Sequence, residues 1–214
     1  MNKWLDSTIK TYERYVGLTH RPVVWEIGSR DGHDGVELAK RIYNGLDDWF
    51  WTNTTVVCFE PNPDQAKIIK KNYPEVRVVE MAASNKTGKA DFKVYHGNEG
   101  DVGSSSLNLD WKEDDLEGHV IKVKTIRLEE YIKDYEKIGI MKIDVEGHSL
   151  EVLEGLEDKL NQVMVIHVET ETWTGSDKAV EEFMKTRGWT LVDVAEEWGG
   201  MPDQVWVNSA VLSD

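Results

Sequence analysis

The sequence predicts an α/β fold built around a mostly parallel β-sheet. Short runs of β-branched residues alternate with stretches of helical periodicity along most of the chain, as in strands joined by crossover helices. The 214 residues suffice for a sizeable core, and we expect a single domain over residues 1–214. An apolar content of 40% and a charged content of 30% are ordinary for a soluble globular protein.

Each element of this fold follows from a local pattern. Apolar residues at near-helical spacing predict an N-terminal helix within residues 1–20. Apolar, β-branched runs predict strands at 23–27, 56–60, 76–82, 140–145, 163–168, 189–194 and 204–207. Further helices are expected at 35–43, after Pro61-Asn62-Pro63, and at 128–135, 149–160 and 177–187. A Gly/Pro turn joins the last two strands, so we expect an antiparallel hairpin there.

A long loop and two further strands interrupt this alternation. Residues 90–95 form a candidate extra strand, and residues 120–126 alternate like an exposed strand. Between them, residues 96–119 are rich in Gly, Ser, Asn and Asp and show no periodicity. Loops of this length in compact domains are often functional. We therefore expect a lid or an acceptor-binding loop that carries the serines 104–106 and Trp111, with an exposed connector as the alternative.

Charge and composition narrow the range of partners. The formal net charge is −15, and we expect the one local basic cluster, Lys67, Lys70 and Lys71, on the solvated face of a helix. Because so acidic a surface repels phosphate backbones, long nucleic acid is disfavoured and a small molecule or a glycan is favoured. No apolar run reaches the roughly 18 residues of a membrane span. A lone cysteine, Cys58, and the lack of a secretory signal favour a cytoplasmic location.

Residues with potential chemistry follow the predicted strands. In an open α/β sheet, ligands bind beyond the carboxyl ends of the strands. Gly28 and Gly32 follow the first strand and permit a tight turn close to a ligand. Glu60 follows the second, where a carboxylate suits the two hydroxyls of a ribose. The later strands are followed by the small residues Ala82, Ala83 and Ser84 and by the acids Asp144, Glu146, Glu169 and Glu171. Taken singly, each is equally well explained as a turn residue or a helix cap.

The glycine spacing separates two kinds of cofactor. A dinucleotide fold carries G-x-G-x-x-G, because a pyrophosphate needs several free backbone N–H groups at a helix N-terminus. Here the spacing from Gly28 to Gly32 is G-x-x-x-G, and four acids crowd the same edge. These acids repel a polyphosphate and attract the sulfonium and ammonium groups of S-adenosylmethionine. We therefore predict S-adenosylmethionine as the cofactor.

With these residues in place, the sequence resembles the FkbM family of methyltransferases over about residues 23–168. The resemblance rests on E-I-G-S-R-D-G at 26–32, F-E-P-N-P at 59–63, S-S-S-L at 104–107, M-K-I-D-V-E-G at 141–147 and L-E-V-L-E-G at 150–155. It implies a Rossmann-like class I methyltransferase sheet of seven strands in the order 3-2-1-4-5-7-6, with the last strand antiparallel and helices on both faces. It also implies methyl transfer from S-adenosylmethionine, usually to a hydroxyl oxygen.

The resemblance also implies roles for individual residues. Gly28 and Gly32 would face the amino-acid part of the cofactor, and Glu60 its ribose. Ala83 and Ser84 would border the adenine, and Asp144 would lie close to the reacting methyl group. The remaining expected cofactor contacts are Glu26, Ser29 and Pro61. The chain departs from the family's usual D-x-G-A-N-x-G, since Glu26, Ser29 and Arg30 replace Asp, Ala and Asn.

Methyl transfer to a hydroxyl often needs a general base, and the sequence offers two. His148 begins the helix after the fourth strand, and a histidine titrates near neutral pH. Glu169, at the end of the fifth strand, is the alternative, and both are expected beside Asp144. These three residues carry oxygen and imidazole ligands that suit Mg²⁺ or Mn²⁺, but no spacing signature demands a metal, and none is predicted.

The acceptor is best described as a hydroxyl on a small molecule, a sugar or a glycan. Trp111, Trp173 and Trp198 lie in polar stretches, where an indole ring can stack on a sugar. Two other functions remain open: a nicotinamide-dependent oxidoreductase on a similar sheet, and a catalytically silent domain that binds the cofactor. The sequence does not indicate the oligomeric state.

Overall fold

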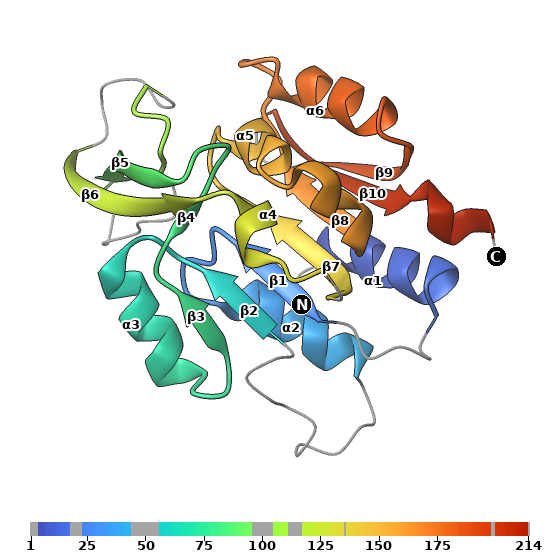
Figure 1. The fold of residues 1–214 in the computed structure, drawn as a ribbon, viewed down its shortest axis with the longest axis horizontal. Coiled ribbons are helices and arrows are strands. Elements are labelled where there is room, and N and C mark those ends of the chain that lie inside the picture. The colour runs from blue at the N-terminus through green and yellow to red at the C-terminus, as the bar shows by residue number, and fades with distance from the viewer. Residues whose placement is uncertain are drawn as a thin grey trace.

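The computed structural model describes residues 4–17, 23–43, 56–95, 105–110, 117–134, 136–197 and 200–213 (Figure 1). The helices are α1 (Trp4–Tyr15), α2 (His33–Ile42), α3 (Pro63–Asn72), α4 (Leu128–Tyr131), α5 (Ser149–Glu154) and α6 (Ser176–Lys185), with the 3-10 helices η3 (Glu157–Gln162) and η4 (Ser209–Ser213). The strands are β1 (Val24–Ile27), β2 (Val56–Phe59), β3 (Arg77–Val79), β4 (Ala82–Ala83), β5 (Gly88–Tyr95), β6 (Gly118–Ile126), β7 (Ile138–Ile143), β8 (Val163–Glu169), β9 (Trp189–Glu197) and β10 (Met201–Asn208).

The main sheet has seven strands in the order β3-β2-β1-β7-β8-β10-β9. The pairs from β3 to β8 are parallel, and β10 is antiparallel to both β8 and β9. Counted along the chain within this sheet, the order is 3-2-1-4-5-7-6. The predicted fold class and the antiparallel last strand are therefore confirmed, and the expected terminal hairpin is β9–β10.

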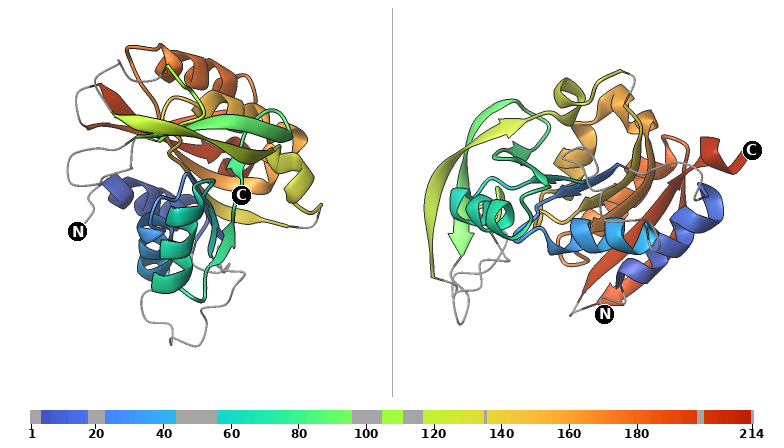
Figure 2. Two further views of the ribbon diagram at one scale, coloured as in Figure 1. Left: turned by 90° about the vertical axis from the view of Figure 1, so that its left-hand side faces the viewer. Right: turned by 90° about the horizontal axis from the view of Figure 1, so that it is seen from below.

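Helices cover both faces of this sheet (Figures 1 and 2). Leu5 and Tyr12 of α1 and Leu38 of α2 pack with Val24 of β1 in the core on one face. The core on the other face contains Trp25, the next residue of β1, together with buried residues of α4, α5 and α6. Successive side chains of a strand point to opposite faces, and burial of both faces explains the continuous apolar runs of the central strands.

A second, three-stranded sheet lies beside the carboxyl end of the main one. Its order is β4-β6-β5, with β4 parallel to β6 and β5 antiparallel to it. The extra strands expected at 90–95 and 120–126 are both here. The single strand expected at 76–82 is instead divided, because a turn from Val79 to Met81 ends β3, and Ala82–Ala83 pair with β6. Lys93 of β5 and Ser106 form an isolated β-bridge, which holds the segment 105–110 against β5.

The helix expected at 149–160 is interrupted. α5 ends at Glu154, and η3 follows from Glu157. Gly155 passes so close to the loop after β4 that a Cβ would lie 2.1 Å from the carbonyl oxygen of Ser84. This close approach of the two backbone segments explains why the helix is interrupted at Gly155. Of the loop expected at 96–119, residues 96–104 and 111–116 lie outside the described residues, and β6 begins at Gly118.

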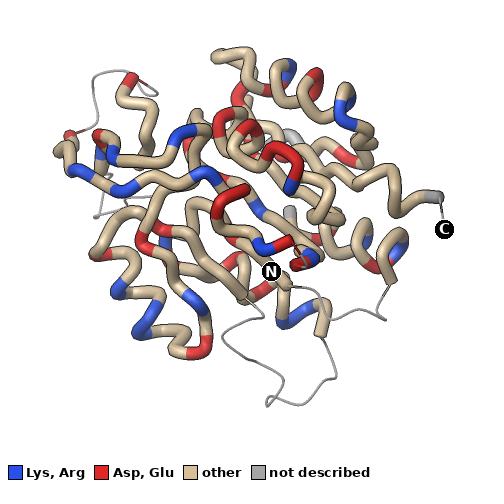
Figure 3. The backbone as a smooth tube through the Cα atoms, in the orientation of Figure 1, with Lys and Arg blue, Asp and Glu red and all other residues tan. Residues whose placement is uncertain are grey.

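Charged residues of both signs are distributed along the chain, with Lys and Arg prominent on α3 and β6 (Figure 3). Lys67, Lys70 and Lys71 are all exposed, as expected for the solvated face of a helix. No helix among the described residues combines the length and the apolar character that crossing a membrane requires.

Candidate functional site

A pocket lies where the carboxyl ends of β1, β2 and β7 meet the small sheet. It encloses about 560 Å³ of space, which includes its open mouth. The lining residues are Gly28, Arg30, Phe59, Glu60, Pro61, Asn62, Gln65, Ala82, Ala83, Phe92, Ser105, Leu107, Asp144, Val145, Glu146 and His148. The sheet edge at which the sequence predicts a site is thus hollowed.

The two glycines of the β1–α2 turn have different surroundings. Both have positive φ, +82° at Gly28 and +77° at Gly32. A Cβ on Gly28 would lie 1.8 Å from the carbonyl oxygen of Asp144, so no side chain fits there. Gly32 instead packs against Ile69 of α3, where a Cβ would lie 2.9 Å from Cγ2. Gly28 lines the pocket, whereas Gly32 shapes the start of α2.

Glu60 is a buried carboxylate at the pocket wall. Its Oε2 accepts a hydrogen bond from the backbone N–H of Arg30 at 2.8 Å, and its Oε1 accepts one from Asn62 at 2.8 Å. Burial raises the pKa of Glu60 to about 7, although these two donors act in the opposite direction. Each oxygen keeps a second lone pair. The carboxylate therefore joins the loops after β1 and β2 and can still accept hydrogen bonds from a ligand.

Glu26 and Ser29 lie beneath the pocket, outside its lining. Glu26 is buried, accepts a hydrogen bond from the backbone of Gly35 in α2, and lies 3.4 Å from the Cys58 thiol that donates to it. Burial raises the pKa of Glu26 to about 8. Ser29 Oγ donates to the carbonyl oxygen of Glu26 at 2.9 Å. In this structure both side chains fix the β1–α2 turn.

The small residues after β3 border the pocket through Ala82 and Ala83. Ser84 is buried next to them, and its Oγ lies 3.0 Å from Nε2 of His148. His148 lines the pocket, and its Nδ1 lies 3.6 Å from Glu151. Burial lowers the pKa of His148, although Glu151 and Glu154 oppose this shift. The imidazole is therefore neutral at pH 7 and can take up a proton.

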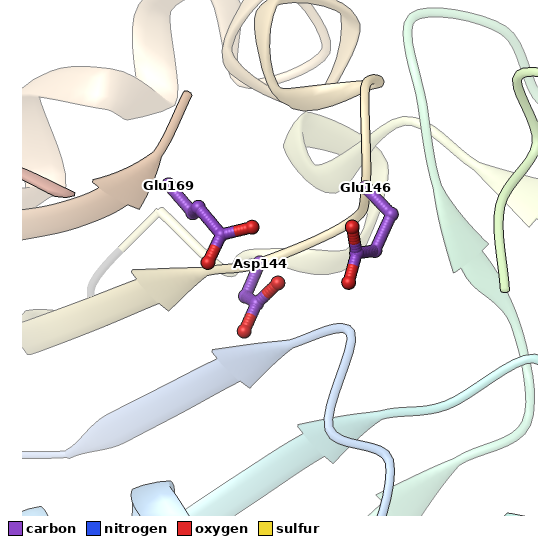
Figure 4. A group of neighbouring side chains, drawn as sticks. All are labelled: Asp144, Glu146 and Glu169. Atoms are coloured by element: carbon purple, nitrogen blue, oxygen red, sulfur yellow. The ribbon is translucent and has the colours of Figure 1, made fainter. Parts of the chain in front are cut away.

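Three carboxylates meet at the ends of β7 and β8 (Figure 4). One oxygen each from Asp144, Glu146 and Glu169 lies within 4.8 Å of the others. Burial, followed by the charges of Asp144 and Glu146, raises the pKa of Glu169 to about 10, as expected when acids share a site. We assign no metal here, because acidic groups at this spacing are common without one. His148 contacts Ser84 and is not part of this cluster.

The remaining acid, Glu171, is buried and holds the backbone. Its Oε1 accepts a hydrogen bond from the N–H of Gly147 at 2.9 Å, and its Oε2 accepts one from Ser176 Oγ at 2.5 Å. Glu171 therefore ties the loop after β8 to the loop after β7, behind the acidic cluster.

Sequence reasoning missed several residues of this site. Phe92 reaches the pocket from the small sheet, and no local pattern connects it to β1 or β7. Ser105 and Leu107, which also line the pocket, belong to the S-S-S-L segment of the loop that was expected to be functional. Lys142 forms ion pairs with Asp34 and Asp144 at 3.1 and 2.8 Å. The sequence did contain a sign that Lys142 has a special role, because it is a lysine within an otherwise apolar central strand.

Backbone strain gathers at the same edge. Arg30 and Glu146 both line the pocket, and both have positive φ, 48° and 54°. Non-glycine residues rarely adopt this region, which favours Asn, and such strain often marks functional sites. Arg30 occupies the place where the FkbM motif usually has Asn.

A model of the FkbM methyltransferase domain matches residues 26–191. The chain belongs to this family. Among proteins it resembles, the hexuronic acid methyltransferase AglP of Haloferax volcanii is 25% identical over 151 residues, 69% of this chain and 55% of that protein. Methyltransferase sdnD of Sordaria araneosa is 30% identical over 106 residues, 44% of this chain and 40% of that protein. The chain thus spans about half the length of these relatives.

Solved structures of the same fold have much lower sequence identity. A METTL16 methyltransferase domain superposes with a TM-score of 0.52 at 14% identity, covering 96% of this chain and 81% of that one. A ribosomal protein L11 methylase from Lactobacillus delbrueckii subsp. bulgaricus superposes with a TM-score of 0.50 at 10% identity, covering 97% and 79%. These superpositions support the fold alone. Family membership confirms S-adenosylmethionine as the cofactor of this domain and leaves the oxidoreductase alternative without support.

Proposed function

We propose that the protein transfers a methyl group from S-adenosylmethionine to a hydroxyl oxygen of a small molecule, a sugar or a glycan. One observation carries the proposal: within an FkbM domain, five of the nine residues expected at the cofactor line one pocket. Gly28, Glu60, Pro61, Ala83 and Asp144 come from four separate segments of the chain and all border it.

The pocket fits this cofactor by shape and by charge. Gly28 allows the β1–α2 turn to pass directly beside the backbone of Asp144 at the pocket, and Ala82 and Ala83 leave space for a flat base. Glu60 offers free lone pairs at the wall, where two ribose hydroxyls can donate to it. The carboxylates of Asp144 and Glu146 in the pocket lining attract a positive charge and repel phosphates. When bound, the cofactor supplies an electrophilic methyl group on a sulfonium sulfur.

His148 is the general base that these surroundings favour. As a methyl group moves to a hydroxyl oxygen, the new O–C bond replaces the C–S bond, whose electron pair stays on sulfur, and the hydroxyl proton must leave. With Nε2–H donating to Ser84 Oγ, Nδ1 is the nitrogen that takes this proton, and Glu151 stabilises the cation that results. Glu169 is a poor base at neutral pH, because its raised pKa keeps it protonated.

A sugar hydroxyl is the acceptor class with most support. Trp173 is 53% exposed and lies in the loop between β8 and α6, two residues beyond Glu171. Exposed indole rings stack well on sugars. AglP, to which this chain is similar, is named for a hexuronic acid substrate. Trp111 and Trp198 lie outside the described residues.

Isothermal titration with S-adenosylmethionine tests the cofactor site. Replacing Glu60 by Gln removes the charge and half of the acceptor capacity, so we expect about a tenfold to hundredfold weaker affinity. Glu80→Gln is the matched control, because Glu80 is an exposed acid paired with Lys70 outside the pocket lining. Absence of binding to the unsubstituted protein would overturn the cofactor assignment.

The acceptor requires a separate screen. We expect release of S-adenosylhomocysteine with one or more members of a panel of sugars, sugar nucleotides and small hydroxyl compounds. Cofactor binding without turnover on any acceptor would instead favour the catalytically silent domain.

A further inference from the structure

Lys142 is a buried charged residue that the proposed mechanism does not use. It lies in β7, at the centre of the main sheet, and its side chain is 5% exposed. Burying a lysine is costly unless the ammonium group is paired. The neighbours of Lys142 therefore indicate why it is tolerated at this position.

Acids surround the Lys142 ammonium group on several sides. Nζ lies 2.8 Å from Oδ2 of Asp144, and 3.1 Å from Oδ2 of Asp34 in the first turn of α2. Glu26, its neighbour in register on β1, is a third acid. Burial opposes the charged form, but these three carboxylates outweigh it and raise the pKa of Lys142 well above its usual value. On β8, His167 is its register neighbour and Glu169 lies farther along the strand.

The two ion pairs connect separate parts of the cofactor site. Asp34 belongs to the helix that begins directly after Gly32, so it is fixed to the β1–α2 turn. Asp144 follows β7, lines the pocket and belongs to the acidic cluster. Lys142 is outside the pocket lining. It therefore contacts the site through these two carboxylates.

We propose that Lys142 is a positioning residue, which holds the carboxylate of Asp144 and the first turn of α2 in fixed relation and so sets the negative charge that faces the cofactor's sulfonium group. The inference rests on the proposed function, since it concerns binding of S-adenosylmethionine. Without the ammonium group, the carboxylate of Asp144 would lose the ion pair that holds it at 2.8 Å. The Asp144 side chain, which is 29% exposed, would then turn toward solvent.

The test compares two ligands that differ in charge at sulfur. S-adenosylmethionine carries the sulfonium, and S-adenosylhomocysteine lacks both its methyl group and that charge. In Lys142→Met we expect the affinity for S-adenosylmethionine to fall about tenfold or more, and the affinity for S-adenosylhomocysteine to fall clearly less. The ratio of the two affinities is the decisive readout, because a purely structural ion pair would not change it.

Two further variants make the result unambiguous. Lys159→Met removes a lysine that pairs with Asp134 outside the pocket lining, and it should leave both affinities unchanged. Asp34→Asn keeps Lys142 and its pair with Asp144 and should weaken binding of both ligands, because only the link to α2 is lost. It also provides the measurement if Lys142→Met does not fold.

An unchanged affinity ratio in a folded Lys142→Met protein would overturn the role toward Asp144, and unchanged affinities in Asp34→Asn would overturn the role toward α2. Failure of the wild type to bind either ligand is a different result, which would overturn the proposed function itself.

Discussion

His148 and Glu169 show how surroundings divide the roles of two candidate bases. Both were expected near the reacting group, and both are removed from water to a large extent. Burial disfavours the charged form of either group, so it makes the histidine neutral and the glutamate protonated at pH 7. A neutral histidine accepts a proton, whereas a protonated carboxyl group does not. The same physical cause thus favours one candidate and disfavours the other.

Replacing His148 by Gln should therefore reduce turnover. A general base typically contributes about a hundredfold or more, so we expect kcat at saturating acceptor to fall by about that factor. In the wild type, kcat should be retained to lower pH than for a histidine of ordinary pKa, because the lowered pKa of His148 moves the loss of the neutral base to lower pH.

His119→Gln is the matched control for this prediction. His119 is exposed on β6 and lies outside the pocket lining, so its replacement should not change kcat. If His148→Gln has the turnover of the wild type, His148 is not the base.

At the scale of elements, the loop between β8 and α6 combines a rigid base with an exposed aromatic ring. Glu171 anchors the loop through Gly147 and Ser176. Thr172 bonds to the backbone of Gly200, and Trp173 packs beside that glycine. A ring held in this way loses little conformational freedom when it binds a sugar.

Trp173→Ala should raise the KM for the acceptor by roughly fivefold to thirtyfold, the equivalent of about 1–2 kcal/mol of lost stacking. The affinity for S-adenosylmethionine should stay constant, and Trp173→Phe should recover part of the loss. Ile68→Ala, at a residue of α3 with 40% exposure, is the control for loss of an exposed apolar side chain. Steady-state kinetics that show an unchanged acceptor KM would remove Trp173 from the acceptor site.

Elements were predictable from sequence where one local pattern decided them. The buried strands β1, β2, β7 and β8 were recognisable from their apolar runs, and Pro63 and Asn62 marked the start of α3. Contacts between distant segments decided the rest. Gly155 ends α5 because it meets the backbone of Ser84. Ala82 leaves the main sheet because β6 offers it a partner.

The same distinction holds for the site. Gly28, Glu60 and Asp144 follow strand ends, and they do border the pocket. The motif also predicts Glu26 as a cofactor contact. Its burial under α2, however, depends on packing against Gly35 and Cys58. Because the packing between strands and helices determines which face of a motif is buried, position in the sequence alone could not separate these residues.

For the whole molecule, the main electrostatic feature is an excess of acidic residues, some of which are buried. The net charge is −15. Burial also raises the pKa of three carboxyl groups, to about 8 for Glu26, about 7 for Glu60 and about 10 for Glu169. The folded protein therefore keeps protons at neutral pH that the unfolded chain releases near pH 4.5.

The free energy of unfolding of the protein without ligand should fall as the pH rises from about 5 to 9. Over this range the folded state binds more protons than the unfolded state, so the slope against pH is negative, by up to about 1.4 kcal/mol per pH unit for each group. Urea denaturation at pH 5.5, 7 and 8.5 measures it. Glu26→Gln should flatten the curve between pH 5 and 8, whereas the exposed Glu80→Gln should not. Stability that increases with pH would contradict these pKa shifts.

The division between β3 and β4 also has a consequence for the lifetime of the bound state. Only Glu80 and Met81 separate the end of β3 in the main sheet from the start of β4 in the small one. The pocket is bounded by both sheets, but the two large apolar cores lie mainly on the main sheet, and the small sheet has a smaller cluster of its own. We therefore expect the small sheet to have the lower local stability and to open as a unit while the main sheet stays folded. Dissociation of the cofactor product would then be governed by this local opening, at a far smaller free-energy cost than unfolding of the whole protein.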